Sequence, residues 1–189
     1  MVPLFARLAA LLAMATAAAA AAAAATTTVR TVKVMTQNAW NHDNGPNWSE
    51  RKRRLAAEVK RQGADVVAWQ ELRVRSDGTG KGMMDDLAEL LPELPYTLFQ
   101  SASPENGGEG VGLSSRFPIA RHEWLPLANG DGTDRNKRKA LFAAISVPGA
   151  ARPLSVFNAH ISYDKEQQVA QAMELAALME KRPTPQVLM

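Results

Sequence analysis

The sequence predicts a mixed α/β sandwich, in which β-sheets and helices pack in layers. Segments typical of strands and helices alternate in the first part of the chain, and a strand-rich stretch follows over residues 96–160. The run ADVVAWQEL at residues 64–72 is mostly apolar, which is typical of a strand buried on both faces. Early alternation followed by clustered strands indicates sheets that pack with helices in a mixed arrangement.

The first expected elements are a strand, a helix and a second strand. Residues 30–40 alternate in their centre and indicate a strand that ends at Gln37 and Asn38. After a turn rich in Asn, Asp, Gly and Pro, Ser49 can cap a helix over residues 49–62, and Gly63 ends it. The apolar stripe expected on that helix is Leu55, Ala56 and Val59.

The later elements follow from the same patterns. Met and Leu recur at helical spacing over residues 83–91, and Pro92 bounds that helix. A third, amphipathic helix is expected over residues 165–181. Further strands are expected at residues 96–100, 111–114, 119–125, 140–147 and 154–160, and PQVLM at 185–189 begins another.

Residues 1–28 are predicted to be a signal peptide with an Ala/Thr-rich linker, and residues 29–189 to be one domain. The first seven residues carry one positive charge, and the 18 residues that follow carry none and end in nine alanines. A transmembrane anchor is the alternative, since 18 uncharged residues approach the spanning length. Alanine is only weakly apolar, which favours a cleaved signal peptide and no stable membrane span. We therefore expect an exported protein, periplasmic or extracellular.

Composition limits the classes of chemistry that the chain can perform. Its 189 residues suffice for one domain with a sizeable core. The net charge of +3 and a pI near 9.4 are compatible with a phosphate-bearing substrate. The chain has no cysteine, which excludes disulfides, cysteine nucleophiles and thiolate metal sites.

Polar side chains stand at the ends of several predicted strands. Asn38 ends the first strand, Glu71 the second, and Asn158 and His160 the one at residues 154–160, while Glu109 stands just before GVGLSSR. A carboxylate two residues after the apolar VVAW is costly to bury unless a cation or hydrogen bonds compensate it. The oxygen atoms of Asn38 and Glu71 suit a hard divalent ion, above all Mg²⁺.

Several other classes of site are excluded by their missing motifs. The sequence contains no H-E-x-x-H, G-x-S-x-G, Walker A or G-x-G-x-x-G pattern. His42 and His122 match no motif, and both are expected to be surface residues.

Four segments in order carry a resemblance to a known family. The segments VMTQNAW, ADVVAWQEL, EGVGLSSRFPI and LSVFNAHIS resemble the successive signatures of the endonuclease/exonuclease/phosphatase superfamily. This superfamily includes deoxyribonucleases, abasic-site endonucleases, neutral sphingomyelinases and inositol polyphosphate 5-phosphatases. The resemblance spans about residues 29–189 and implies a two-sheet α/β sandwich of the deoxyribonuclease-like type.

The resemblance also implies roles for individual residues. Asn38 matches the asparagine beside the metal and the scissile phosphate, and Glu71 matches the main metal-binding carboxylate. His160 matches the catalytic histidine, and Glu109 resembles the glutamate that orients that histidine. These matches imply Mg²⁺, for which Mn²⁺ can substitute, and in-line attack by water on a phosphodiester.

Three further residues are expected to contact the substrate phosphate. Asn158 would shape the same rim as His160, and Arg138 or Lys139 stands where the family often keeps a basic phosphate contact. The segment DRNKRK that contains Arg138 is equally consistent with a solvated loop.

The sequence does not decide which class of substrate the protein acts on. Mild basicity leans toward nucleic acid over phospholipid. A sphingomyelinase-like lipid phosphodiesterase and a non-catalytic binding module remain the alternatives.

The resemblance covers roughly the first half of the family domain. A GDFN segment that follows the strand beginning at PQVLM in this family, and a later Asp-His pair, have no counterpart in the sequence. We therefore expect the chain to be the N-terminal portion of such a domain and inactive alone. A missing C-terminal half or a partner chain would complete it.

Overall fold

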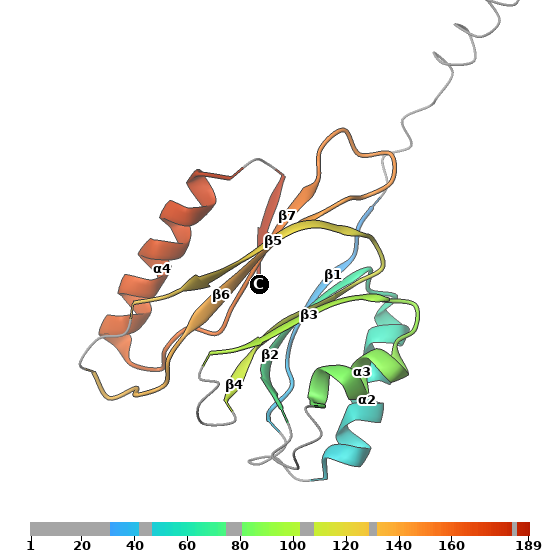
Figure 1. Cartoon of the computed structure of the whole chain (residues 1–189), viewed down its shortest axis with the longest axis horizontal. Coiled ribbons are helices and arrows are strands. Elements are labelled where there is room, and N and C mark those ends of the chain that lie inside the picture. The colour runs from blue at the N-terminus through green and yellow to red at the C-terminus, as the bar shows by residue number, and fades with distance from the viewer. Residues whose placement is uncertain (1–30, 42–46, 75–80, 103–107, 129–131, 183–184) are drawn as a thin grey trace, which may run out of the picture. The chain divides into compact units, whose positions relative to one another are not determined.

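Two four-stranded sheets form the core of the structure, a computed structural model in which residues 31–41, 47–74, 81–102, 108–128, 132–182 and 185–189 are described. The first sheet has the order β1-β2-β4-β3 and the second the order β5-β6-β7-β8 (Figure 1). All described residues belong to one compact unit, residues 31–189. The predicted signal peptide at residues 1–28 lies outside the described residues, so the predicted domain boundary stays a prediction.

The first sheet combines one parallel pair with antiparallel pairs. β1 runs parallel to β2, β2 is antiparallel to β4, and β4 is antiparallel to β3. Helices α2 and α3 pack on its outer face, where their apolar residues contact those of β2 (Figure 1). The bounds of these elements are β1 Val34–Asn38, α2 Trp48–Gln62, β2 Val66–Arg73, α3 Met83–Leu90, β3 Tyr96–Ser101 and β4 Glu109–Ser115.

The second sheet mirrors this arrangement. β5, β6 and β7 are antiparallel neighbours, and β8 pairs in parallel with β7. Leu175 of α4 packs on this sheet in a cluster with Leu127 and Ala140. The bounds are β5 Ile119–Pro126, β6 Lys139–Ile145, β7 Leu154–Ala159, α4 Lys165–Glu180 and β8 Gln186–Leu188.

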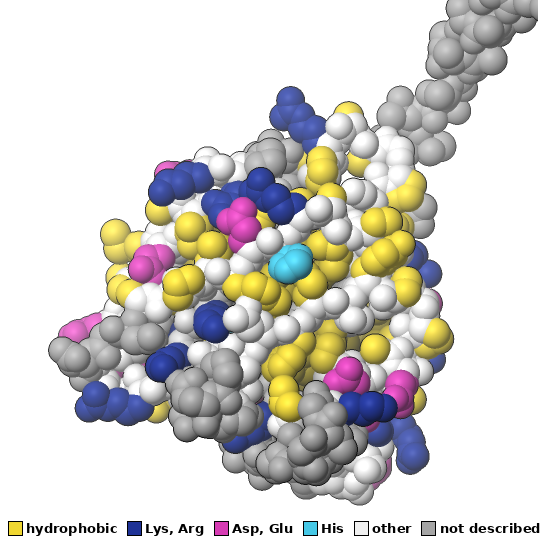
Figure 2. Space-filling model, viewed as in Figure 1, with side chains coloured by type: hydrophobic (Ala, Val, Ile, Leu, Met, Phe, Trp, Pro, Cys, Tyr) yellow, Lys and Arg dark blue, Asp and Glu magenta, His cyan; other side chains and the backbone are white. Residues whose placement is uncertain are grey.

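The main apolar core lies between the two sheets. Val66 and Leu113 of the first sheet pack against Leu141 and Val156 of the second, and all four are fully buried. Figure 2 shows hydrophobic side chains between β5 and β3, each of which is one of the two edge strands of its sheet. The layers are therefore helix, sheet, sheet and helix, which confirms the predicted two-sheet α/β sandwich.

Several predicted boundaries differ from the observed ones by a few residues, and three of the differences concern residues discussed above. The N-cap of α2 is Asn47 rather than Ser49, and its side chain accepts a hydrogen bond from the backbone N–H of Glu50 at 3.3 Å. Asn47 has φ 37°, a left-handed conformation that asparagine tolerates better than most residues. Glu109 opens β4 instead of preceding it, and His160 follows β7 instead of ending it.

Within the part of the chain that the structure describes, no helix combines the length and the apolar character needed to cross a membrane.

Candidate functional site

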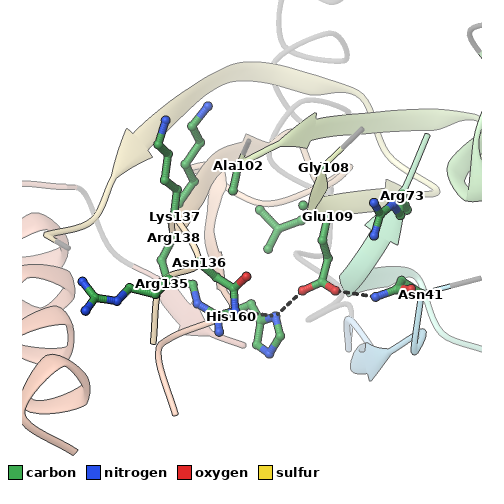
Figure 3. Close-up of a pocket in the computed structure, with 13 residues that line it drawn as sticks. Asn41, Arg73, Ala102, Gly108, Glu109, Arg135, Asn136, Lys137, Arg138 and His160 are labelled. Atoms are coloured by element: carbon green, nitrogen blue, oxygen red, sulfur yellow. Dashed lines mark hydrogen bonds and ion pairs between the residues drawn. The ribbon is translucent and has the colours of Figure 1, made fainter. Parts of the chain in front are cut away.

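The predicted polar residues converge at one edge of the sandwich because of the strand directions. β1 and β2 are parallel, so Asn38 and Glu71 lie at the same end of the first sheet. β4 runs antiparallel to β2, which brings Glu109 at its start to that end. The end of β7 supplies His160, whose imidazole lies beside Glu109 in Figure 3.

Glu71 occupies a strained position in a β-bulge. The register between β2 and β4 shifts between Trp69 and Leu72, and Glu71 has φ 55°. A bulge turns a side chain away from the regular alternation, and a positive φ in a residue other than glycine costs free energy. The Glu71 carboxylate accepts a hydrogen bond from Asn38 Nδ2 at 2.7 Å. The structure therefore brings the two predicted metal ligands into direct contact.

Asn158 fastens this bulge from the opposite sheet. Its Nδ2 donates to the carbonyl oxygens of Trp69 at 2.9 Å and Gly112 at 2.7 Å. Trp69 of β2 and Gly112 of β4 are the last regularly paired residues before the bulge. Its Oδ1 accepts from Gln70 Nε2 at 2.7 Å. Asn158 is 0% exposed, so it lies beneath the site rather than on its rim. This burial argues against the predicted contact between Asn158 and the phosphate, which stays a prediction.

His160 lies between the two carboxylates. Its Nδ1 is 3.4 Å from Glu109 Oε1, and its Nε2 is 3.8 Å from Glu71 Oε1. Glu109 also accepts a hydrogen bond from Asn41 Nδ2 at 2.7 Å. Glu109 thus contacts His160, while the orienting role that the resemblance implies for it stays a prediction.

The pKa of Glu109 reflects opposing effects. Burial alone would raise it, but hydrogen bonds from His160 and Asn41 and the charges of His160 and Arg138 outweigh burial and lower it below the ordinary value. The carboxylate is therefore held in its charged form, in which it accepts a hydrogen bond from the imidazole N–H and stabilises a positive charge on the ring.

Arg138 contacts the same imidazole nitrogen as Glu109. Its Nη1 lies 3.2 Å from His160 Nδ1. A guanidinium only donates, so Nδ1 accepts from Arg138 when it lacks a hydrogen and donates to Glu109 when it carries one. The two contacts are alternatives, and the tautomer of His160 decides between them.

A buried ion pair holds Arg138 in place. Asp134 Oδ2 accepts from Arg138 Nη2 at 2.7 Å and from Nε at 3.1 Å, and both side chains are almost fully buried. Burial opposes ionisation of Asp134. The backbone N–H of Asn136, the Arg138 guanidinium and the Ser162 hydroxyl overcome this effect and lower the pKa of Asp134 to about 2.

Basic side chains surround a cavity of about 320 Å³ beside His160 and Glu109 (Figure 3). Lys139 lines it and donates from Nζ to the Ser101 carbonyl oxygen at 3.1 Å, so both predicted basic residues lie at the site. The basic residues in the lining are Arg73, Arg135, Lys137, Arg138 and Lys139. Arg138 is 7% exposed and belongs to the wall, which contradicts a fully solvated DRNKRK loop.

The donor set fits a divalent cation. Glu71, Glu109 and His160 each offer one ligand atom, and these atoms lie within 4.8 Å of one another. Two carboxylates and the nearby Asn38 amide are ligands that a hard cation such as Mg²⁺ accepts. Glu71 and Asn38 are the pair predicted for this role.

Asn41 and Asp134 are site residues that sequence reasoning missed. Asn41 belongs to the turn after the first strand. Asp134 stands four residues before Arg138, so the single acid that opens the basic segment DRNKRK is the one signal that points to an ion pair. Among the unassigned histidines, His122 is exposed on β5 as expected, and His42 lies outside the described residues.

Comparisons with known proteins agree with this fold. A mannosyl-6-phosphatase of Bacteroides thetaiotaomicron superposes with a TM-score of 0.68 at 18% identity, over 84% of this chain and 64% of that one. An endonuclease/exonuclease/phosphatase family protein of Leptotrichia buccalis gives 0.63 at 17% identity, over 84% and 67%. A humanized TDP2 of D. rerio gives 0.58 at 18% identity, over 83% and 63%.

The chain therefore spans about two thirds of the length of these solved structures. No curated protein matches its sequence. The model of the Endonuclease/Exonuclease/phosphatase family matches residues 35–189, which is most of the chain and includes every predicted site residue. The chain belongs to the endonuclease/exonuclease/phosphatase family.

Proposed function

We propose that this protein hydrolyses phosphodiesters with the help of a divalent metal ion, Mg²⁺ by preference and Mn²⁺ as a substitute. The observation that carries the proposal is the convergence of ligand atoms from Glu71, Glu109 and His160 within 4.8 Å, beside a basic cavity. The fold is that of a family of phosphoric ester hydrolases. Because the chain spans only part of its neighbours' length, the proposal concerns the whole protein expressed from its gene.

The side chains divide the work of hydrolysis. Glu71 and Asn38 would hold the ion, which when bound supplies charge that stabilises the leaving oxygen. The oxygen of a water molecule attacks phosphorus while the bond to the leaving oxygen breaks, and His160 Nε2 takes the proton of that water. Glu109 orients the imidazole through Nδ1 and stabilises its positive charge, at the observed 3.4 Å.

The cavity favours an anionic substrate. Five Lys and Arg side chains line it, and Glu109 is the one acid among the described lining residues. A nucleic acid places a second phosphate near the scissile one, whereas a phosphocholine headgroup carries a cation that these side chains repel. We therefore favour nucleic acid over phospholipid as the substrate.

Substrate and mechanism are tested together on the purified protein. With Mg²⁺, we expect nicking of plasmid DNA and no release of phosphocholine from sphingomyelin vesicles. Glu71→Ala and His160→Ala should each lower activity by about 100-fold or more, and His122→Ala on the exposed face of β5 is the matched control. Release of phosphocholine without nicking would overturn the substrate, and full activity in both site variants would overturn the mechanism.

Metal binding is tested without turnover. The electron paramagnetic resonance signal of free Mn²⁺ should fall when the protein is added, and Glu71→Ala should restore it. An unchanged titration in Glu71→Ala would remove Glu71 from the metal site.

We further propose that the protein is exported. The uncharged residues 8–25 after Arg7 support this, together with the small residues at 26–28. Amino-terminal sequencing of protein from the periplasm or the medium should find a start near residues 26–29. Recovery only from the cytoplasm, with Met1 retained, would contradict export.

A further inference from the structure

Trp40 is an exposed tryptophan in the segment that supplies Asn38 and Asn41 to the site. Its side chain is 50% exposed, and its neighbours in sequence, Asn38 and Asn41, contact Glu71 and Glu109. In sequence, Trp40 thus stands between two residues that hydrogen-bond the site carboxylates, and its backbone is bonded to one of them, Asn38.

The backbone of Trp40 is held in a conformation that the residue itself disfavours. Trp40 has φ 49°, which is uncommon for any residue other than glycine and costly for a bulky one. Its N–H donates to Asn38 Oδ1 at 2.8 Å, and its carbonyl oxygen accepts from Arg51 Nη2. Arg51 Nε also donates to the Ala39 carbonyl oxygen at 3.2 Å. Hydrogen bonds to Asn38 and Arg51 thus maintain the strained backbone of Trp40. Backbone strain that the surrounding structure maintains is typical of functional sites.

The same arginine supports the indole. Arg51 Cζ lies 5.7 Å from the centroid of the Trp40 ring and 5.3 Å from that of Trp48. Trp48 is itself fixed, since its Nε1 donates to Asp86 Oδ2 at 2.7 Å. A cation already occupies one side of the Trp40 π-system, which leaves that ring a poorer partner for a second cation such as choline.

Other exposed apolar side chains lack these supports. Tyr96 is 41% exposed and Tyr163 62%, and neither has a positive φ or a cation over its ring among the contacts described. Single exposed apolar residues need no explanation. Trp40 differs because its exposure is imposed by a strained backbone that Asn38 and Arg51 secure.

We propose that the indole of Trp40 is a stacking platform for the nucleobase next to the scissile phosphate. The inference rests on the proposed function and specifies how the substrate is recognised. Every nucleobase has a π-face, so a platform of this kind increases affinity without reading sequence. Asn38, which bonds both Glu71 and the Trp40 backbone, couples the platform to the metal site.

Equilibrium binding tests the platform without turnover. Calorimetry in Ca²⁺ compares thymidine 5′-monophosphate with 2-deoxyribose 5-phosphate, which lacks the base. We expect the nucleotide to bind about fivefold more tightly or better, and Trp40→Ala to reduce this ratio to near one. Trp40→Phe should keep most of it. Tyr96→Ala removes an exposed aromatic at the far end of the first sheet and should leave the ratio unchanged.

Three results would overturn the inference: an unchanged ratio in Trp40→Ala with its melting temperature preserved, no preference for the base in the natural protein, or an equal Trp40-dependent gain with mannose 6-phosphate. The last would assign the platform to a sugar ring. Trp40-dependent binding of the nucleotide without any hydrolysis of DNA in Mg²⁺ would instead refute the proposed function and leave the platform standing.

Discussion

The two sheets hold their halves of the site by different means. On the first sheet, Glu71 depends on a β-bulge with φ 55° and on two neutral amide donors. Asn38 bonds its carboxylate, and Asn158 bonds the backbone beside the bulge. On the second sheet, Arg138 depends on a buried ion pair with Asp134. We call Glu71 and its bulge the strained half of the site, and the buried Asp134–Arg138 ion pair the charged half.

The two halves should respond differently to the loss of a charge. A strained carboxylate can lose its charge without a large cost in folding, because its hydrogen-bonding partners are neutral. A buried ion pair cannot lose one charge without leaving the other unpaired in the interior. We therefore expect changes on the first sheet to affect activity more than stability, and changes on the second to affect stability first.

Asp134→Asn is the strongest test of the charged half. It removes the countercharge that accepts two hydrogen bonds from the buried Arg138 guanidinium, and we expect the free energy of unfolding to fall by about 3–5 kcal/mol. Urea denaturation measures this loss. Glu89→Gln, an exposed carboxylate on α3, is the control and should change stability by under about 0.5 kcal/mol. Equal effects of the two substitutions would show that the ion pair contributes nothing.

Glu71→Gln is the matching test of the strained half. The amide keeps the shape of the side chain but loses the charge that would hold the metal, so kcat/KM should fall by about 100-fold or more. Because the Asn38 contact is neutral, the free energy of unfolding should change by less than about 1 kcal/mol. A loss of stability as large as that of Asp134→Asn would remove the distinction between the halves.

Asn158→Ala tests the link between the sheets. The change leaves the carbonyl oxygens of Trp69 and Gly112 and the amide of Gln70 without their buried partner. We expect a loss of about 2–3 kcal/mol in unfolding free energy and a fall in kcat with KM nearly unchanged, because the bulge under Glu71 loosens. A rise in KM alone would favour the phosphate contact first predicted for Asn158.

Low pH should remove the stability that the Asp134–Arg138 ion pair contributes. The pKa of Asp134 is lowered from 3.8 to about 2, so its contribution is complete above pH 4 and is lost as the pH falls through 2. This contribution is about 2 kcal/mol. The stability difference between the natural protein and Asp134→Asn, measured by urea denaturation at successive pH values, should therefore narrow from pH 4 to pH 2. A constant difference would show that the pKa of Asp134 is not lowered.

The residues at strand ends could be predicted from the sequence, whereas the buried ion pair could not. Asn38, Glu71, Glu109 and His160 could be predicted because they stand at strand ends, where sequence pattern and family resemblance coincide. Asp134 could not, because its pairing with Arg138 is local in sequence, whereas its burial and the position of the pair beside His160 arise only in the folded chain. The fold could be predicted further, because alternation and apolar runs fixed the strands to within a few residues.

Asn158 shows where pattern alone fails. Alternation correctly placed it on the opposite side of β7 from Phe157, which contacts Phe142 at 5.2 Å between ring centroids. Both faces of this strand are covered, however, so the opposite side is the interior between the sheets rather than solvent. Pattern alone also mispredicts the N-cap of α2. Asn47 and Ser49 are both good N-cap residues, and the backbone conformation at Asn47 decides between them.

Asn41→Ala should have the smallest effect, and it tests whether the two halves meet at Glu109. The substitution removes a hydrogen bond that lowers the pKa of Glu109 and leaves His160 and Arg138 to oppose burial. The acid limb of the kcat/KM profile should therefore move to higher pH, with activity at neutral pH reduced by about tenfold or less. Asn41→Asp, which puts a second negative charge beside Glu109, should move the limb further in the same direction. If both variants leave the limb in place, Glu109 is governed by the charged half alone, through His160 and Arg138.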